Sequence, residues 1–466
     1  MPAQTHRDLS RTVKAYDVRG VVPDDLDETV ATALGEAFAQ LVAADGAKRV
    51  VIAYDMRESS IPLSDAFAAG VRSRGLDVLD AGLGSTDMLY FASGHLDAPG
   101  AMFTASHNPA RYNGIKLCRA GAAPIGQDTG LAEIRASTEL LLAEPPHGRP
   151  QTGTTSKVDL LDAYARHLLN LVPLDGCRPL KVVVDAGNGM GGHTVPAVFA
   201  GLPIDVIPMY FELDGNFPNH EANPLDPANL VDLRARVTAE GADAGLAFDG
   251  DADRCFVVDE RGEPVSPSAI AALVAVRELA KHPGGTIIHN LITSRAVPDI
   301  VKEHGGEPVR TRVGHSFIKA EMARTGAVFG GEHSAHYYFR DFWRADTGML
   351  AALHVLSALG EQDRPLSALT EKFCRYVGSG EINSTVDDQA ACTAAVARAY
   401  EGRPGAVEDR LDGLTVTLPD GCWFNLRPSN TEPLLRLNVE AGDADRMEAL
   451  RDDVLDLIRA ANEETR

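Results

Sequence analysis

Three aspartates occupy every second position in the segment FDGDADR, at Asp249, Asp251 and Asp253. Carboxylates this close together repel one another unless a hard cation lies among them, and ligands made only of oxygen favour magnesium or calcium over zinc. The segment follows the apolar run AGLAF and precedes CFVVDE, and both runs are typical of β-strands. We therefore expect a divalent-metal site at the end of a sheet, where α/β proteins bind ligands.

Two other interpretations of the acidic segment remain open. An EF-hand loop also begins Asp-x-Asp-x-Asp, and Glu260 falls at its twelfth position. However, Arg254 occupies the sixth position, where an EF-hand needs glycine, and the flanks predict strands where an EF-hand has helices. The third interpretation is a solvated acidic loop without a ligand, which the apolar flanks disfavour.

A second candidate lies in FTASHNPARYNGIK, where Ser106 precedes His107. The Asn-Pro pair at residues 108 and 109 is incompatible with a helix, so we expect Ser106 on a tight exposed turn. Such a turn suits a nucleophile or a phosphate carrier. Lys116 follows on a predicted strand, where its amine would supply a cation or transfer a proton.

The segment LRPSNTEPLLRL predicts an anion site near the C-terminus. It combines a guanidinium, two hydroxyls and an amide in a turn bounded by two prolines, with backbone N–H groups left to bind an anion. The residues are Arg427, Ser429, Asn430 and Thr431. A serine- and asparagine-rich segment of this kind is also compatible with a plain turn.

Two further loops, VGHSFIK and GGEHSAHYYF, concentrate donors and acceptors of the kind that bind sugar hydroxyls. Their polar residues include Gly314, His315, Glu332, Ser334 and His336. The histidines do not have the spacing of a helical zinc-binding pair, so a sugar site is favoured over a zinc site.

Composition excludes several classes of protein. The chain has 466 residues, of which 44% are hydrophobic and 24% charged, as in globular proteins. Its net charge of -22, without a basic cluster, argues against nucleic acid and against an anionic membrane surface. Six widely spaced cysteines, the lack of an apolar leader and the lack of a spanning apolar run predict a soluble cytoplasmic protein.

Three stretches share the pattern of a strand, a crossover helix and a second strand, beginning at Lys48, Pro179 and Gly284. They predict three similar α/β domains with mixed sheets. The segments after Gly360 alternate in the manner of an antiparallel sheet and predict a C-terminal α+β domain. From the composition of the connecting segments, we expect domains at residues 1–155, 156–256, 257–366 and 367–466.

The motifs together resemble the α-D-phosphohexomutase family, in particular its bacterial phosphomannomutase/phosphoglucomutase branch. The matching segments, in family order, are KAYDVRG, TASHNP with YNGIK, DGDADR, VGHS, GEHSAH and RPSNTEP. The resemblance implies four domains around a central cleft. It also implies interconversion of hexose 6-phosphate and hexose 1-phosphate through a phosphoserine and a hexose 1,6-bisphosphate, which serves as activator as well as intermediate.

The resemblance further implies a role for each candidate residue. Ser106 would carry the phosphate and bind Mg²⁺ together with Asp249, Asp251 and Asp253. The proton-transfer candidates are Lys116, Arg19 and His336. The substrate-binding candidates are Tyr16, Arg254, Gly314, His315, Glu332, Ser334, Arg427, Ser429, Asn430 and Thr431.

Two departures from the family pattern concern substrate choice. Ala335 stands where the family's sugar loop usually has glycine, and Asn290 to Ile292 replace a segment that in dual-specificity relatives often carries a lysine. Arg295, Arg340 and Arg344 are candidates to replace that cation. Mannose phosphate is the expected substrate, with glucose phosphate as a second. The alternatives are a phosphoglucosamine mutase and a non-catalytic sugar-phosphate or divalent-ion binding protein, and either a monomer or a small homo-oligomer is expected.

Overall fold

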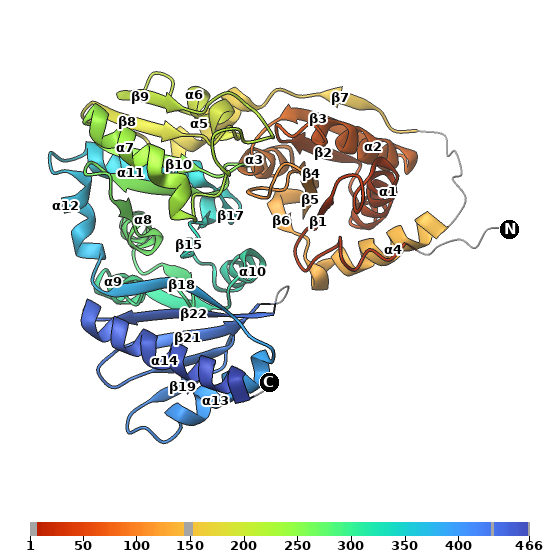
Figure 1. Ribbon diagram of the computed structural model, residues 1–466. Helices are drawn as coiled ribbons and strands as arrows, with labels where there is room; N and C mark the ends of the chain where they lie inside the picture. The colour runs from red at the N-terminus through yellow and green to blue at the C-terminus, as the bar shows by residue number, and fades with distance from the viewer. Residues whose placement is uncertain (1–6, 144–151, 430–432, 465–466) are drawn as a thin grey trace. The chain divides into compact units, whose positions relative to one another are not determined.

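The computed structural model describes residues 7–143, 152–429 and 433–464 (Figure 1). The predicted site residues Asn430 and Thr431 lie outside these ranges. The chain forms two compact units, one made of Met1–Val265 with Ser334–Leu369 and the other of Ser266–His333 with Thr370–Arg466. The division falls within the predicted third domain, and the four predicted domain ranges stay predictions.

The first unit begins with a sheet in the order β1-β5-β4-β2-β3-β7, with β6 paired to β5. The strands are β1 (Val18–Val21), β2 (Arg49–Tyr54), β3 (Asp77–Leu83), β4 (Gly100–Phe103), β5 (Tyr112–Arg119), β6 (Ala123–Pro124) and β7 (Thr155–Lys157). The helices are α1 (Glu28–Ala44), α2 (Ser60–Ser73), α3 (Thr86–Leu96) and α4 (Leu131–Ala143). Strands β2, β3 and β4 are parallel, whereas β5 runs antiparallel to β4 and β1. The β4–β5 connection therefore reverses the chain at the end of the sheet, and it carries Ser106.

The same unit contains a second sheet in the order β12-β11-β10-β8-β9. Its elements are α5 (Leu161–Leu171), β8 (Leu180–Asp185), α6 (Gly191–Val198), β9 (Ile204–Met209), α7 (Val231–Glu240), β10 (Ala244–Phe248), β11 (Cys255–Asp259) and β12 (Pro264–Val265). The hairpin β16 (Tyr337–Phe339) and β17 (Ala345–Asp346), followed by α11 (Gly348–Gly360), completes the unit. Strands β10 and β11 are buried along their whole length, so the turn between them, with its aspartates, is held by core on both sides.

The second unit contains parallel strands and an antiparallel sheet. Its first part comprises α8 (Pro267–Lys281), β13 (Thr286–Asn290), α9 (Ala296–Glu303), β14 (Glu307–Thr311), α10 (His315–Thr325) and β15 (Phe329–Gly331), and the short α12 (Leu366–Thr370) lies at the unit boundary. Its second part comprises β18 (Val377–Thr385), α13 (Gln389–Tyr400), β19 (Val407–Asp409), β20 (Leu414–Thr417), β21 (Trp423–Pro428), β22 (Leu434–Ala441) and α14 (Ala444–Glu464). The order β18-β22-β21-β20-β19 is antiparallel throughout, and α13 and α14 both contact this sheet.

The predicted repeat is confirmed. Each of the three stretches forms a parallel pair of strands joined by a helix, as β2-α2-β3, β8-α6-β9 and β13-α9-β14. The predicted fold class, three α/β domains with mixed sheets and a C-terminal α+β domain, is confirmed as well. Among the described residues, no helix is both long and apolar enough to cross a lipid bilayer.

Candidate active site

Ser106 lies in a strained turn directly after β4. Its backbone has a φ of 49°, in the left-handed region that residues other than glycine rarely occupy. The Ser106 N–H donates to Thr104 Oγ1 at 2.9 Å. Only 6% of the residue is exposed, so the turn is present as expected but the prediction that Ser106 is exposed is wrong. Strain of this kind persists where the surrounding contacts enforce it, and it is common at catalytic positions.

The buried guanidinium of Arg57 holds this turn in place. Its N–H groups donate to four backbone carbonyls of the β4–β5 connection at 2.8 to 3.1 Å, those of Ser106, Asn108, Pro109 and Tyr112. Arg57 Nε donates to Asp55 Oδ2 at 3.1 Å, which balances the buried charge. Sequence reasoning missed Arg57, although an arginine two residues after an aspartate at a strand end was visible in YDMRES.

The three predicted aspartates meet in the β10–β11 turn. One carboxylate oxygen of each of Asp249, Asp251 and Asp253 lies within 4.8 Å of the others, and the residues are at most 1% exposed. Ser106 Oγ donates to Asp249 Oδ2 at 2.9 Å, so the serine belongs to the same cluster. Because strands flank the turn and its side chains are buried, the EF-hand and solvated-loop interpretations are both wrong.

Two cations balance part of this negative charge. Lys116 Nζ donates to Asp251 Oδ2 at 2.8 Å and to Asp253 Oδ2 at 2.6 Å. Arg254 Nε donates to Asp249 Oδ2 at 2.9 Å. Burial raises the pKa of Asp249, whereas Lys116 overcomes burial and lowers the pKa of Asp253 to about 2. Burial disfavours the ammonium of Lys116, but Asp251 and Asp253 raise its pKa well above the usual value. Lys116 is therefore protonated in this arrangement.

The donor set fits a hard divalent cation. Asp251 Oδ1 and Asp253 Oδ1 are buried and have no hydrogen-bond partner among the described residues. Unpartnered buried oxygens are costly unless something binds them, and carboxylate oxygens are the ligands that Mg²⁺ prefers. With two cations opposite three carboxylates, the site can accept further positive charge.

Two residues at the start of α3 support the acidic turn, and sequence reasoning missed both. Thr86 donates to Asp251 twice, from Oγ1 to Oδ2 at 2.6 Å and from its backbone N–H to the carbonyl at 3.0 Å. The adjacent Asp87 accepts hydrogen bonds from Ser85, Tyr164 and Thr347, which belong to the α3 cap, α5 and the α11 cap. Burial raises the pKa of Asp87 to about 6. A single carboxylate thus fixes three helices beside the acidic turn.

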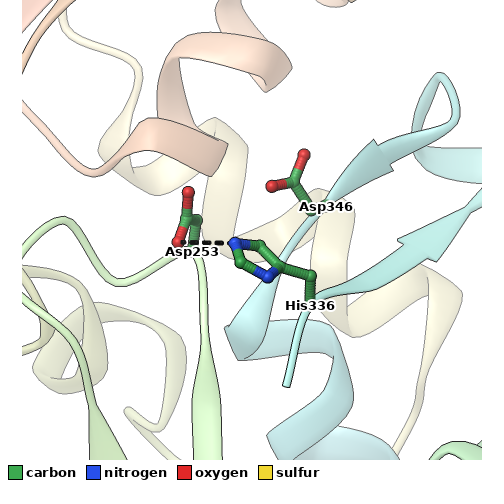
Figure 2. Close-up of side chains that lie close together, drawn as sticks. All are labelled: Asp253, His336 and Asp346. Atoms are coloured by element: carbon green, nitrogen blue, oxygen red, sulfur yellow. Dashed lines mark ion pairs between the residues drawn. The ribbon is translucent and has the colours of Figure 1, made fainter. Parts of the chain in front are cut away.

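His336 lies on the other side of Asp253. Its Nε2 is 3.8 Å from Asp253 Oδ1, and its Nδ1 is 2.9 Å from Ser334 Oγ. Figure 2 shows the imidazole directed at Asp253, with the Asp346 carboxylate at the end of β17 close to both. An isolated antiparallel β-bridge between Arg254 and His336 fixes the distance between the acidic turn and the segment that carries His336. The structure therefore places Ser334 and His336 beside the acidic turn, together with Asp346, which sequence reasoning did not select.

Arg19 and His107 complete the surroundings of Ser106. Arg19, on β1, donates to the Ala105 carbonyl at 3.1 Å, to Asp17 at 2.6 Å and to Asn108. Burial and the nearby arginines lower the pKa of His107 to about 3, so its ring is neutral. His107 Nδ1 accepts from Arg254 at 2.7 Å. Tyr16, two residues before β1, is half-buried.

In the second unit, Glu332 is buried and held by its neighbours. Asn290 Nδ2 donates to Glu332 Oε2 at 2.9 Å, and the Gly314 N–H donates to the same oxygen at 3.4 Å. Thr293 Oγ1 in turn donates to Asn290 Oδ1 at 2.7 Å. A neutral amide on β13 thus orients the glutamate. His315 begins α10 directly after Gly314.

Arg427 lies at the end of β21, and Ser429 follows it in a buried position. The Arg427 guanidinium lies 3.5 Å from Glu381 and 3.8 Å from Asp412. Of the arginines considered as replacements for the family lysine, Arg295 donates to the Gly421 carbonyl and lies over the Tyr376 ring. Its guanidinium is therefore used in packing between β13–α9 and the C-terminal sheet.

Sequence profiles of the phosphoglucomutase/phosphomannomutase family match four consecutive segments. These are alpha/beta/alpha domain I at residues 10–141, domain II at 162–262, domain III at 266–376 and the C-terminal domain at 381–457. A phosphomannomutase from Escherichia coli strain K12 is 41% identical over 458 residues, covering 96% of this chain and 98% of its own length. A protein described as phosphohexose mutases from Xanthomonas campestris pv. campestris is 43% identical over 450 residues, covering 96% and 98%.

A crystal structure of a phosphoglucomutase/phosphomannomutase family protein from Burkholderia thailandensis superimposes with a TM-score of 0.87 at 34% identity, covering 99% of this chain and 98% of that one. The fold and these matches place the chain among the phosphohexomutase enzymes. It belongs to the phosphoglucomutase/phosphomannomutase family, which confirms the resemblance seen in the sequence.

The sugar-loop departure at Ala335 generates a stability prediction. Ala335 has a φ of 64°, where glycine avoids a steric cost of about 1–2 kcal/mol. Because glycine also makes the unfolded chain more flexible, we expect Ala335→Gly to stabilise the protein by about 0.5–1 kcal/mol. Ala358→Gly, within α11, should instead destabilise it by about 1 kcal/mol. Thermal unfolding of both variants checks this, and shifts of the same sign would contradict it.

Replacing Arg57 tests its role under the serine turn. Arg57→Lys keeps the positive charge but cannot reach four carbonyls and Asp55 together. We expect faster hydrogen exchange at the backbone amides of residues 104–112 and a loss of stability of about 1–3 kcal/mol. Arg74→Lys, at the partly buried pair with Glu36, is the control and should leave this exchange unchanged. Equal exchange in both variants would show that Arg57 does not hold the turn.

Proposed function

We propose that this enzyme interconverts hexose 6-phosphates and hexose 1-phosphates through a phosphorylated Ser106 and a hexose 1,6-bisphosphate. The observation that carries the proposal is the position of Ser106, whose Oγ lies 2.9 Å from Asp249 Oδ2 within the buried acidic cluster. Packing of a serine in a protein core does not require three buried carboxylates beside it, so the cluster indicates a chemical role for the hydroxyl.

Mg²⁺ is the proposed metal, held by Asp249, Asp251, Asp253 and an oxygen of phosphorylated Ser106. When bound, it would neutralise charge on the transferring phosphoryl group. The unpartnered oxygens of Asp251 and Asp253 support this assignment. Without a cation, a phosphate dianion beside three carboxylates would be strongly disfavoured.

In the proposed reaction, the bond between Ser106 Oγ and phosphorus breaks while a bond forms from the sugar hydroxyl to phosphorus. The hydroxyl proton passes to a base. In the second half-reaction, a bond forms from Ser106 Oγ to the phosphorus of the other phosphate while its bond to the sugar oxygen breaks, and that oxygen takes up a proton. Arg254, held by Asp249 and 2.7 Å from His107, supplies positive charge at the transferring group. Lys116, Arg19 and His336 are the proton-transfer candidates, and all three lie in the same unit as Ser106. Because Lys116 is protonated in this arrangement, its part would be to donate a proton.

By family resemblance, further residues are assigned to the sugar and to its second phosphate. Glu332 and Ser334 would bind sugar hydroxyls, with Tyr16, Gly314 and His315 as further contacts. Arg427 and Ser429 would bind the non-reacting phosphate, and Asn430 and Thr431 join them by family resemblance alone. The name of the Escherichia coli relative supports mannose phosphate, and the broader name of the Xanthomonas relative supports glucose phosphate as a second substrate.

The test is conversion of mannose 1-phosphate in the presence of Mg²⁺ and a trace of hexose 1,6-bisphosphate. We expect Ser106→Ala to lose at least about 10³-fold in kcat, because the group that carries the phosphate is absent. Ser137→Ala, on α4, is the matched control and should keep full activity. Intact-protein mass spectrometry should show one added phosphate on wild type that Ser106→Ala lacks.

Equal activity of wild type and Ser106→Ala would contradict the proposal. Preference for glucosamine phosphate in direct competition would reassign the substrate to that of a phosphoglucosamine mutase. If no hexose phosphate is turned over and Ser106 is unmodified, the result would indicate a non-catalytic protein that binds sugar phosphates or divalent ions.

A further inference from the structure

The hairpin of β16 and β17 has active-site residues at its base and a tryptophan at its tip. His336 directly precedes β16, and Asp346 ends β17. The tip is the short helical turn Arg340–Phe342, which Trp343 follows. The pairing between the two strands consists of two residue pairs, so the tip and the base are close. A displacement of the tip would therefore also displace His336 and Asp346.

The backbone at the tip is strained. Trp343 has a φ of 54° and Arg344 a φ of 60°, so two consecutive residues other than glycine occupy the left-handed region. The Arg344 N–H donates to the Phe339 carbonyl at 2.8 Å, which closes the tip. Strain of this kind persists only where the surrounding contacts enforce it. The side chains at the tip must therefore make contacts that hold this conformation.

The half-buried indole of Trp343 packs against helices α3 and α5. Its ring centroid is 5.1 Å from that of His167, with the two rings stacked at 26°, and 6.1 Å from that of Phe91, edge to face. The adjacent Phe342 is fully buried and lies 5.9 Å from His167. Favourable aromatic pairs have centroids about 4.5–7 Å apart. The two helices thus receive the tip with aromatic side chains.

Gly94, on α3, makes the close approach of the indole possible. A Cβ at this position would lie 2.2 Å from Cδ2 and Cε2 of Trp343 and 2.7 Å from Cζ2, which are atoms of the six-membered ring. Glycine inside a helix is less favourable than alanine, and here it leaves the space that the ring fills. We call Phe91, Gly94 and His167 the aromatic socket. The fit between Trp343 and this socket is specific in shape.

Helix α3 connects the aromatic socket to the acidic turn. Thr86, in the first turn of the helix, donates to Asp251 Oδ2 at 2.6 Å. The next residue, Asp87, accepts from Thr347 Oγ1 at 2.7 Å, and Thr347 directly follows β17. Figure 1 shows β17 beside α3. The hairpin thus contacts one helix at both ends, through Thr347 at its base and through Trp343 at its tip.

We propose that Trp343 is a positioning residue for His336 and Asp346, and that its fit in the aromatic socket sets where these side chains lie relative to Asp253. Figure 2 shows the three side chains that this contact would keep together, with His336 Nε2 3.8 Å from Asp253 Oδ1. A misplacement of about 1 Å near reacting groups can lower a rate about 100-fold. The kinetic consequence rests on the proposed function, whereas the anchoring of the hairpin does not.

The first experiment compares wild type with Trp343→Ala and Trp343→Phe. Alanine removes the ring contacts, so we expect hydrogen exchange at the backbone amides of residues 334–347 to become at least about tenfold faster. We expect kcat with mannose 1-phosphate to fall about 10- to 100-fold, with KM changed less than about threefold. Phenylalanine keeps a ring against His167 and should retain kcat within about threefold of wild type.

The second experiment approaches the same contact from the helix. The methyl group of Gly94→Ala would overlap the indole, so this variant should lower kcat about tenfold and speed exchange in residues 334–347. Phenylalanine lacks the fused ring system of the indole and leaves room for that methyl group. The double variant Gly94→Ala/Trp343→Phe should therefore recover kcat to within about threefold of Trp343→Phe, because both residues act through one contact.

Two controls separate positioning from a general loss of stability. Leu34→Ala, in the core of α1, should lower the unfolding temperature but leave kcat and exchange in residues 334–347 unchanged well below that temperature. Mn²⁺ affinity should change less than about twofold in Trp343→Ala, since Lys116 and Thr86 hold the acidic turn without the hairpin. An equal loss of Mn²⁺ affinity and kcat would place the effect at α3 and contradict the proposal.

The inference is overturned if Trp343→Ala keeps the kcat of wild type, whatever its stability, or if the effects of Gly94→Ala and Trp343→Phe simply multiply in the double variant. If Trp343→Ala does not fold, Gly94→Ala and the double variant decide between these outcomes. A wild-type protein that turns over no hexose phosphate would contradict the proposed function. Hydrogen exchange in residues 334–347, and its recovery in the double variant, would then still decide whether Trp343 anchors the hairpin.

Discussion

The burial of three carboxylates in one turn is the constraint on which the rest of the first unit depends. Asp249, Asp251 and Asp253 are at most 1% exposed, and such a cluster is stable only if positive charge and hydrogen bonds surround it. Lys116, Arg254 and Thr86 supply these from strand β5, the turn itself and helix α3.

The same constraint explains why the serine turn is so tightly held. Ser106 has a left-handed backbone conformation, and its hydroxyl meets Asp249 only because the β4–β5 connection is fixed. Arg57 fixes this connection by donating hydrogen bonds to four of its backbone carbonyls. Ser106 and the acidic turn come from different sheets, so their contact depends on buried polar groups such as Asp87, which ties α3 to α5 and α11.

Sequence analysis predicted what is local in the chain. The DGDADR turn, Ser106 and the three βαβ units are each contained in a short segment with recognisable periodicity or spacing. The roles of Arg57, Asp87 and Asn290 were missed because they arise from partners far away in sequence, such as Asn290 with Glu332. An isolated arginine or aspartate has no spacing that distinguishes a buried supporting role from a surface one. Ala335 was recognised as unusual, but its positive φ became visible only in the structure.

The central claim is that the acidic turn binds one divalent cation. This cation would balance the negative charge that Lys116 and Arg254 leave uncompensated. Electron paramagnetic resonance titration with Mn²⁺ tests it directly, since Mn²⁺ takes oxygen ligands as Mg²⁺ does. The account predicts one tight ion per chain in wild type and its loss in Asp251→Asn, with the exposed Asp452→Asn as an unaffected control. Equal Mn²⁺ binding in wild type and Asp251→Asn, or no tight binding in wild type, would contradict it.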